Sequence, residues 1–176
     1  MLELFKKKKS PSYEEILEIF LTQFYSNEAH SWIIQDRYIR ANFDDFFEKL
    51  PADVLKKFIG NQKLIFVLSI GFYINTLDSM SHYVIIVFPE LFRLLKSSAT
   101  NHALAILAHE IGHIVCGHSR KIIDPIKAQV EADRFACELG YAPELDSFLF
   151  DQNDSIEKKI RMTYVTSYMM KDYKRA

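Results

Sequence analysis

The pentapeptide His109-Glu110-Ile111-Gly112-His113 follows an apolar stretch, residues 103–108, and both are expected to lie on one helix. Helix residues four positions apart lie one turn apart on the same face, so the imidazoles of His109 and His113 can reach a single ion. Neutral imidazole nitrogens are common ligands of Zn²⁺. The spacing therefore predicts a zinc site in which His109 and His113 are metal ligands.

Glu110 is turned about 100° around the helix axis from His109, so its carboxylate can approach a metal-activated water without being a ligand. There Glu110 would be the catalytic general base, accepting the proton of that water and passing it to a leaving amine. The predicted function is zinc-dependent hydrolysis of a peptide bond, with a protein or peptide as substrate. The simplest alternative is a helix that carries two surface histidines.

Gly112 lies inside this motif, where a glycine costs about 1 kcal/mol of helix propensity relative to alanine. Its presence indicates that another element packs closely against the helix at this position. A catalytic zinc site also needs a third protein ligand. His118 is near in sequence, but Gly117 and His118 do not have the spacing of a metzincin, so His118 is expected to be a cleft residue or to orient a ligand.

The second relevant stretch is EADRFACELG at residues 131–140. Together with the HEIGH stretch some twenty residues earlier, it resembles the gluzincin metallopeptidases, and most closely the ImmA/IrrE-type intracellular enzymes. The resemblance covers residues 83–140. It implies a zincin-like fold, a cytoplasmic location, and a third zinc ligand that is a Glu one turn before an Asp or Asn.

The chain departs from that pattern at the third ligand, because counting back four residues from Asp133 gives Gln129. On a helical wheel Gln129 and Asp133 lie within the apolar arc, whereas Glu131 lies nearly opposite. Glu131 there shares a solvent face with Lys127, to which it is spaced for an ion pair. Asp133 is the preferred third ligand. Glu131 and Gln129 are rivals, each of which would bind the metal or orient one of its ligands.

An uncharged third ligand would weaken metal retention, which leaves further functions open. One is a catalytically impaired zincin-fold protein that acts as a protein-binding or regulatory module. Another is a metal-dependent hydrolase with a non-peptide substrate, and a last is a helical scaffold with a chance motif. The sequence does not predict the physiological substrate or the oligomeric state.

The N-terminal third of the chain is helical in pattern, over about residues 12–60. Ser12 and Glu15 form a capping box at the start of a helix. Four apolar residues recur on one face of this helix: Ile16, Ile19, Phe20 and Phe24. A second helix is expected over residues 32–43, and residues 44–60 are helical with a fresh start at Pro51.

The middle of the chain is predicted to be β-structure, over about residues 63–88. Residues 63–72 and 83–88 are rich in Ile, Val and Phe and read as two buried strands, with a turn at residues 75–81 between them. We expect these strands to pair antiparallel. A short helix follows over residues 90–96.

The rest of the chain is predicted to be helical. The motif helix would run from a cap at Thr100 or Asn101 to Gly117, and the next from Asp124 to Gly140. A final amphipathic helix covers residues 155–173. The fold class is α+β: one mostly helical, zincin-like domain over residues 1–176, with a small sheet of two or three strands packed beside the HExxH helix.

Composition bounds the function classes. About half of the 176 residues are apolar and the formal net charge is −1, which fits a folded protein and gives no sign of nucleic-acid binding. Two cysteines are too few for a disulfide framework, and no secretory leader is recognised. The longest nearly apolar run, residues 64–74, is too short to cross a membrane. We therefore expect a soluble, cytoplasmic protein.

Overall fold

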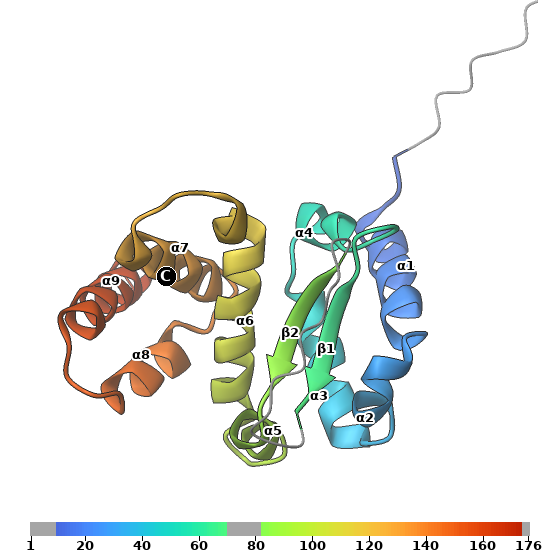
Figure 1. Cartoon of the computed structure of the whole chain (residues 1–176), viewed down its shortest axis with the longest axis horizontal. Helices are drawn as coiled ribbons and strands as arrows, with labels where there is room; N and C mark the ends of the chain where they lie inside the picture. Colours follow the sequence, from blue (N-terminus) through green and yellow to red (C-terminus); the bar gives the residue numbers. More distant parts are fainter. Residues whose placement is uncertain (1–9, 70–81, 174–176) are drawn as a thin grey trace, which may run out of the picture.

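A computed structural model describes residues 10–69 and 82–173 (Figure 1). These residues form α-helices, two single-turn 3₁₀-helices and two strands, consistent with the α+β prediction. The elements are, in chain order, α1 (Tyr13–Tyr25), η1 (Glu28–His30), α2 (Ser31–Ile34), α3 (Arg37–Glu48), α4 (Ala52–Lys57), β1 (Leu64–Leu68), β2 (Tyr83–Val87), α5 (Pro89–Leu95), α6 (Thr100–Cys116), η2 (His118–Arg120), α7 (Pro125–Glu138), α8 (Ala142–Phe150) and α9 (Ile156–Tyr173).

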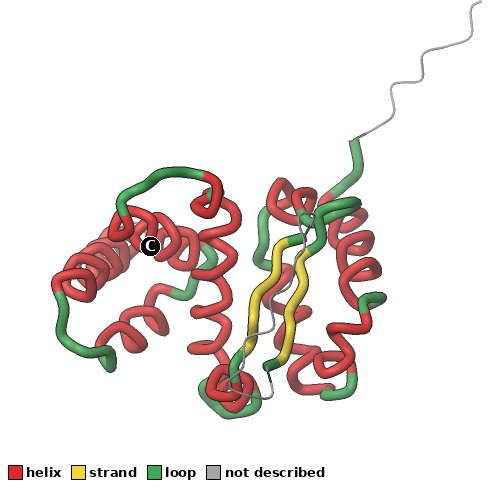
Figure 2. Tube along the Cα trace, viewed as in Figure 1, coloured by secondary structure: helices red, strands yellow, loops and turns green. Residues whose placement is uncertain are grey.

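Helix α6 lies at the centre of the arrangement (Figures 1 and 2). On one side of it stands the two-stranded sheet, whose far face is covered by α1 to α3. On the other side lie α7, α8 and α9, and α6 and α7 are the most extensively packed pair of elements. The HExxH helix therefore separates the sheet from a helical C-terminal group, and none of the helices described is long and apolar enough to span a bilayer.

The capping box at the start of α1 is confirmed, with Ser12 and Glu15 each bonding the other's backbone N–H. Ile16, Phe20 and Phe24 are buried as predicted, but Ile19 is 49 % exposed. At about 100° per residue, Ile19 lies some 60° to one side of Ile16, while both phenylalanines lie on the other side. The core-facing stripe is therefore narrower than the sequence pattern indicated.

The continuous helix predicted over residues 32–43 is wrong. The chain breaks between α2 and α3, where Asp36 accepts hydrogen bonds from the backbone N–H groups of Tyr38 and Ile39 and caps a new helix. Asp is among the best N-cap residues because its side chain satisfies donors that the first turn leaves free. The fresh start at Pro51 is confirmed, since α4 begins at Ala52.

The predicted antiparallel pairing of the strands is also wrong. β1 and β2 are parallel, with Leu64 opposite Tyr83 and Leu68 opposite Val87. A hairpin turn joins strands through a few residues, but residues 69–82 separate these strands, enough for the dozen or more that a parallel crossover requires. The turn expected at residues 75–81 and the end of the first predicted strand lie outside the described residues.

Helix α6 ends as predicted at Gly117, which has a left-handed φ of +69°. Its start differs, because Ala99 occupies the cap and neither Thr100 nor Asn101 caps the helix with its side chain. Thr100 instead donates its hydroxyl to backbone carbonyls of the preceding turn, including that of Ser97 at 2.7 Å. A hydroxyl already engaged in this way is not offered to the first turn of α6.

The close packing inferred from Gly112 is confirmed. A Cβ atom at Gly112 would lie 2.9 Å from the Cα of Ala132 and 3.1 Å from the Cβ of Phe135, both on α7. The backbones of α6 and α7 therefore approach each other at the HExxH motif itself. This contact sets where α7 presents its side chains to the two histidines.

Helices α7 and α9 match their predictions closely, and Asp124 caps α7 through Lys127 N. Helix α8 is an element that the sequence reading missed. It begins with Pro143 in its first turn and buries Leu145 and Leu149 against the core. With α9 it completes the C-terminal group on the side of α6 away from the sheet (Figure 1).

Candidate metal centre

The side chains of His109 and His113 point at a common position. Their Nε2 atoms are 3.1 Å apart, and the rings lie almost perpendicular to each other. Two nitrogens on a tetrahedral zinc ion at 2.0–2.1 Å would be separated by about 3.3 Å. The two imidazoles thus have nearly the spacing of two zinc ligands.

His109 is held by a buried carboxylate on α7. Its Nδ1 lies 2.8 Å from Oδ1 of Asp133, although the N–H is not well aligned with that oxygen. Asp133 is 0 % exposed and also receives two hydrogen bonds of 2.8 Å from Arg161 of α9, one to each carboxylate oxygen. We call His109, Asp133 and Arg161 the inner arm of the site.

The charge of Asp133 is fixed by these partners. Burial alone would raise the pKa of this carboxyl group, but the bonds from His109 and Arg161 and the guanidinium charge outweigh it and lower the pKa. Asp133 is therefore ionised at neutral pH. An ionised carboxylate attracts the proton of His109 to Nδ1, which leaves the lone pair of Nε2 facing His113.

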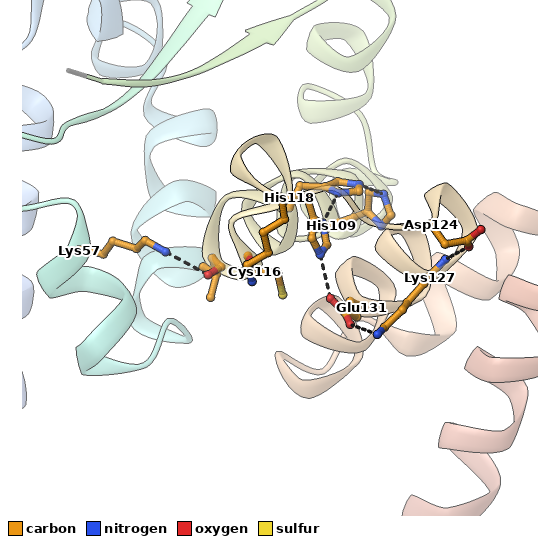
Figure 3. A network of polar contacts seen from close by, with 10 residues as sticks. Lys57, His109, Cys116, His118, Asp124, Lys127 and Glu131 are labelled. Atoms are coloured by element: carbon orange, nitrogen blue, oxygen red, sulfur yellow. Dashed lines mark hydrogen bonds and ion pairs between the residues drawn. The ribbon is translucent and has the colours of Figure 1, made fainter. Parts of the chain in front are cut away.

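His113 is held by a second chain of contacts, which we call the outer arm. Its Nδ1 lies 2.7 Å from Nδ1 of His118, and Nε2 of His118 lies 2.9 Å from Oε2 of Glu131 on α7. Figure 3 shows this link from the end of α6 across to Glu131. Glu131 also lies 3.9 Å from Lys127, the ion pair that the helical wheel predicted.

The proton positions in the outer arm follow from its acidic end. The pKa of Glu131 is lowered, chiefly by the hydrogen bond to His118, so its carboxylate accepts the N–H at Nε2 of His118. In the neutral tautomer with its proton at Nε2, His118 has a bare Nδ1, which accepts from Nδ1–H of His113. The proton of His113 is thus at Nδ1, and its Nε2 also carries a lone pair.

With both protons at Nδ1, two lone pairs face each other across 3.1 Å. This is unfavourable unless a cation lies between them. Burial and the nearby charges of His109, His118 and Arg161 lower the pKa of His113 to about 4, so a proton does not fill that role at neutral pH. The residues present fit a divalent metal ion that accepts imidazole nitrogens.

The three candidates for a further ligand occupy different places on α7. Asp133 is turned away from the Nε2 atoms, toward Nδ1 of His109 and toward Arg161. Glu131 contacts His118 rather than either motif histidine. Gln129 lines a cavity of about 340 Å³ together with His109 and His113.

Glu110 is exposed and lines two neighbouring cavities, as His113 does. One is the cavity shared with Gln129. The other, of about 920 Å³, lies between β2, α5 and α6, and its walls are mainly apolar. Glu110 therefore stands where a bound molecule in the larger cavity would meet the two histidines.

A further group of donor atoms lies at the end of α6. The thiol of Cys116, a ring nitrogen of His118 and a carboxylate oxygen of Glu131 all lie within 4.8 Å of one another. Both cysteines are free thiols. Cys116 is half-buried, whereas Cys137 is buried.

Arg161 is a site residue that sequence reasoning missed. It lies one turn before the fully buried Val165 on α9, so a positive charge falls on the apolar stripe of an amphipathic helix. A buried arginine in such a stripe needs a carboxylate partner, and this signal was available. The choice of Asp133 as the partner depends on the packing of α9 against α7, which no sequence pattern specified.

In a comparison with protein families, residues 79–124 match peptidase family M48. The matched stretch includes β2, α5 and α6 with the whole HExxH motif, and it supports a metallopeptidase assignment. It ends before α7 and so includes none of the third-ligand candidates. The resemblance to ImmA/IrrE-type enzymes is not confirmed by this match. No curated protein and no solved structure matches the chain significantly.

Proposed function

We propose that this protein is a zinc-dependent peptidase whose metal is bound by Nε2 of His109 and Nε2 of His113. The observation that carries the proposal is the 3.1 Å distance between the two Nε2 atoms, with each ring contacted at its Nδ1 by a separate arm. A chance pair of surface histidines would not require both rings to be oriented by contacts at their Nδ1 atoms. The match to peptidase family M48 supports the same class of activity.

A bound zinc ion would lower the pKa of a water molecule bound to it and would polarise the scissile carbonyl. Glu110 supplies the base: its exposed carboxylate takes the proton of the attacking water and returns it to the amine that leaves. Nδ1 of His109 faces Asp133 and Nδ1 of His113 faces His118, which orients both rings with Nε2 toward the metal position. The inner and outer arms thus orient the ligands and do not themselves exchange protons with the substrate.

For the third ligand we now favour the amide oxygen of Gln129 over Asp133. Both oxygens of Asp133 already accept hydrogen bonds from Arg161, and Oδ1 also lies 2.8 Å from Nδ1 of His109. Ligand histidines commonly donate their second nitrogen to such a carboxylate, which is an orienting role. Gln129 lies one turn earlier on α7 and lines the cavity that contains both motif histidines.

The substrate is proposed to be an extended peptide that lies in the larger cavity. Val84, Ile85 and Ile86 of β2 line this cavity, and Glu110 and His113 lie at its other side. A peptide strand beside β2 would gain main-chain hydrogen bonds and bring a carbonyl to Glu110. The apolar walls favour large hydrophobic side chains near the cleaved bond.

The test is proteolysis of an unfolded generic substrate, such as casein, by zinc-loaded protein and by Glu110→Gln. We expect Glu110→Gln to keep its zinc and to lose activity by about 100-fold or more, the range that general bases contribute. Glu90→Gln is the matched control, since Glu90 is an exposed carboxylate that lines the same larger cavity. Equal activity of Glu110→Gln and wild type would contradict the proposal.

Gln129 favours a second candidate function, a zincin-like protein that binds other proteins and has lost catalysis. An amide ligand retains zinc less well than a carboxylate, because it adds no negative charge. Under this alternative wild-type protein is inactive on casein and holds zinc weakly, and Gln129→Glu restores retention. Activity of wild-type protein that depends on Glu110 would exclude it.

A further inference from the structure

We propose that Cys116, His118 and Glu131 form a second metal position, for a thiolate-binding divalent ion such as Zn²⁺ or Cd²⁺. It is separate from the position between His109 and His113, and it does not depend on the proposed function. One thiol, one imidazole and one carboxylate are a donor set that zinc accepts. Their ligand atoms lie within 4.8 Å of one another.

The local fold brings these donors together from two elements. Cys116 is the last residue of α6, and the left-handed turn at Gly117 directs the chain so that His118 follows on the same side. Glu131 reaches them from α7 (Figure 3). In a tetrahedral site with Zn–S of 2.3 Å and Zn–N or Zn–O near 2.0–2.2 Å, donors are about 3.3–3.7 Å apart. The separations between the donor atoms thus need to change by at most about 1.5 Å.

The charges also favour a cation here. Glu131 contributes a carboxylate, whose Oε2 lies 2.9 Å from Nε2 of His118. Metal binding would release the thiol proton of Cys116 to solvent as the sulfur–metal bond forms. The ion would displace the N–H of His118 Nε2 from Glu131.

This displacement has a consequence for the first metal position. When Nε2 of His118 is bound to a metal, the proton of the neutral ring is at Nδ1, 2.7 Å from Nδ1 of His113. Nδ1 of His113 must then accept, which moves its own proton to Nε2. That is the atom that needs a lone pair to bind metal beside His109. Filling the second position therefore weakens the first.

The direct test is a titration of reduced, metal-free protein with Cd²⁺, followed by thiolate-to-metal charge-transfer absorbance in the ultraviolet. We expect a band in wild type that disappears in Cys116→Ser and persists in Cys137→Ser, because Cys137 is the buried thiol away from the cluster. The band should also persist in a His109→Ala, His113→Ala double variant, since neither residue belongs to the cluster. Glu131→Gln should weaken Cd²⁺ binding by at least about tenfold, as loss of even an outer-shell partner does.

Absence of the band in wild type, or a band unchanged by Cys116→Ser, would overturn the second position. The antagonism rests in addition on the proposed function and has its own readout. Excess Zn²⁺ should inhibit casein cleavage by wild type and not by Cys116→Ser. A wild type with the cadmium band and no zinc inhibition would overturn the antagonism alone. Failure of the peptidase proposal would show as inactivity of wild type at every zinc concentration, with the cadmium band intact.

Discussion

The inner and outer arms each orient one motif histidine through its Nδ1 atom, but they do so with different contacts. In the inner arm a carboxylate with 0 % exposure meets His109 directly and is neutralised by the bidentate Arg161. In the outer arm a second histidine stands between His113 and a carboxylate whose side chain is 32 % exposed. In both arms the Nε2 atom of the motif histidine is left with its lone pair. For His109 this results from contact with a buried carboxylate, and for His113 from a second histidine that contacts a partly exposed carboxylate.

The difference indicates which arm is structural and which can be adjusted. A buried ion pair that loses one partner leaves an uncompensated charge in the core, which is costly. A carboxylate that reaches solvent can lose its partner and be rehydrated. The inner arm therefore couples the metal position to the stability of the α7–α9 packing, whereas the outer arm can rearrange while the fold is kept.

The largest predicted effect breaks the inner arm. Asp133→Asn removes the charge that Arg161 faces and should destabilise the metal-free protein by about 3–5 kcal/mol. The matched change in the outer arm, Glu131→Gln, should leave the urea midpoint nearly unchanged. Urea denaturation of both variants against wild type measures this. Equal loss of stability in the two variants would show that the arms do not differ as described.

The next predicted effect is on stability and zinc binding together, and it arises from the contact between α6 and α7 at Gly112. Gly112→Ala gains about 1 kcal/mol of helix propensity, but its Cβ would meet the backbone of Ala132 at 2.9–3.0 Å. Overpacking against backbone typically costs 1–3 kcal/mol. We expect a net loss of about 1 kcal/mol in urea denaturation and weaker zinc binding, because α7 carries both carboxylates. A more stable variant with unchanged zinc affinity would contradict the packing account.

These predictions also separate what the sequence could specify from what it could not. His109, His113 and Gly112 were predictable, because helical spacing and the cost of a glycine act within one element. Asp133 was predicted to be a metal ligand, and the helical wheel behind that prediction gives the face of a residue and not its partner. The pairing of Asp133 with Arg161, and that of His118 with Glu131, arise from contacts between separate elements.

The fold shows the same division. The ends of α6 and α7 follow from Gly117 and from Asp124, which are local signals. The parallel pairing of β1 and β2 depends on the path of the chain between them, and an apolar strand pattern does not encode it. The break between α2 and α3 had a local signal at Asp36, but the apolar periodicity on both sides concealed it.

An effect of similar size, on zinc affinity and not on stability, tests the assignment of the third ligand. Gln129→Glu adds a negative charge to the cavity that both motif histidines line, and it should tighten zinc binding by about tenfold, which corresponds to ~1.4 kcal/mol. Competition with a chelator measures the affinity. Gln152→Glu is the control, because Gln152 lines the same cavity from beyond α8. A larger gain from Gln152→Glu would place the third ligand elsewhere.

A further effect is a pH dependence of stability that begins in the outer arm. Burial and neighbouring charges lower the pKa of His113 from its ordinary 6.5 to about 4. Between these values the unfolded chain binds more protons than the folded one, so stability of the metal-free protein falls as pH drops from about 6.5 toward 4.

Urea midpoints at pH 7.5, 6 and 5 measure this slope, and His113→Gln should reduce it. Some slope should remain, because burial also lowers the pKa of His30, a core histidine bonded to Phe24 and Phe66. An identical slope in wild type and His113→Gln would mean that folding does not lower the pKa of His113.

The most direct test of the central claim is to locate the metal. Crystals of protein loaded with one equivalent of zinc should give an anomalous difference peak at the zinc absorption edge. The peak is predicted between Nε2 of His109 and Nε2 of His113, at about 2.0–2.1 Å from each nitrogen. A peak only at Cys116, His118 and Glu131, or no peak near the two motif histidines, would contradict the claim.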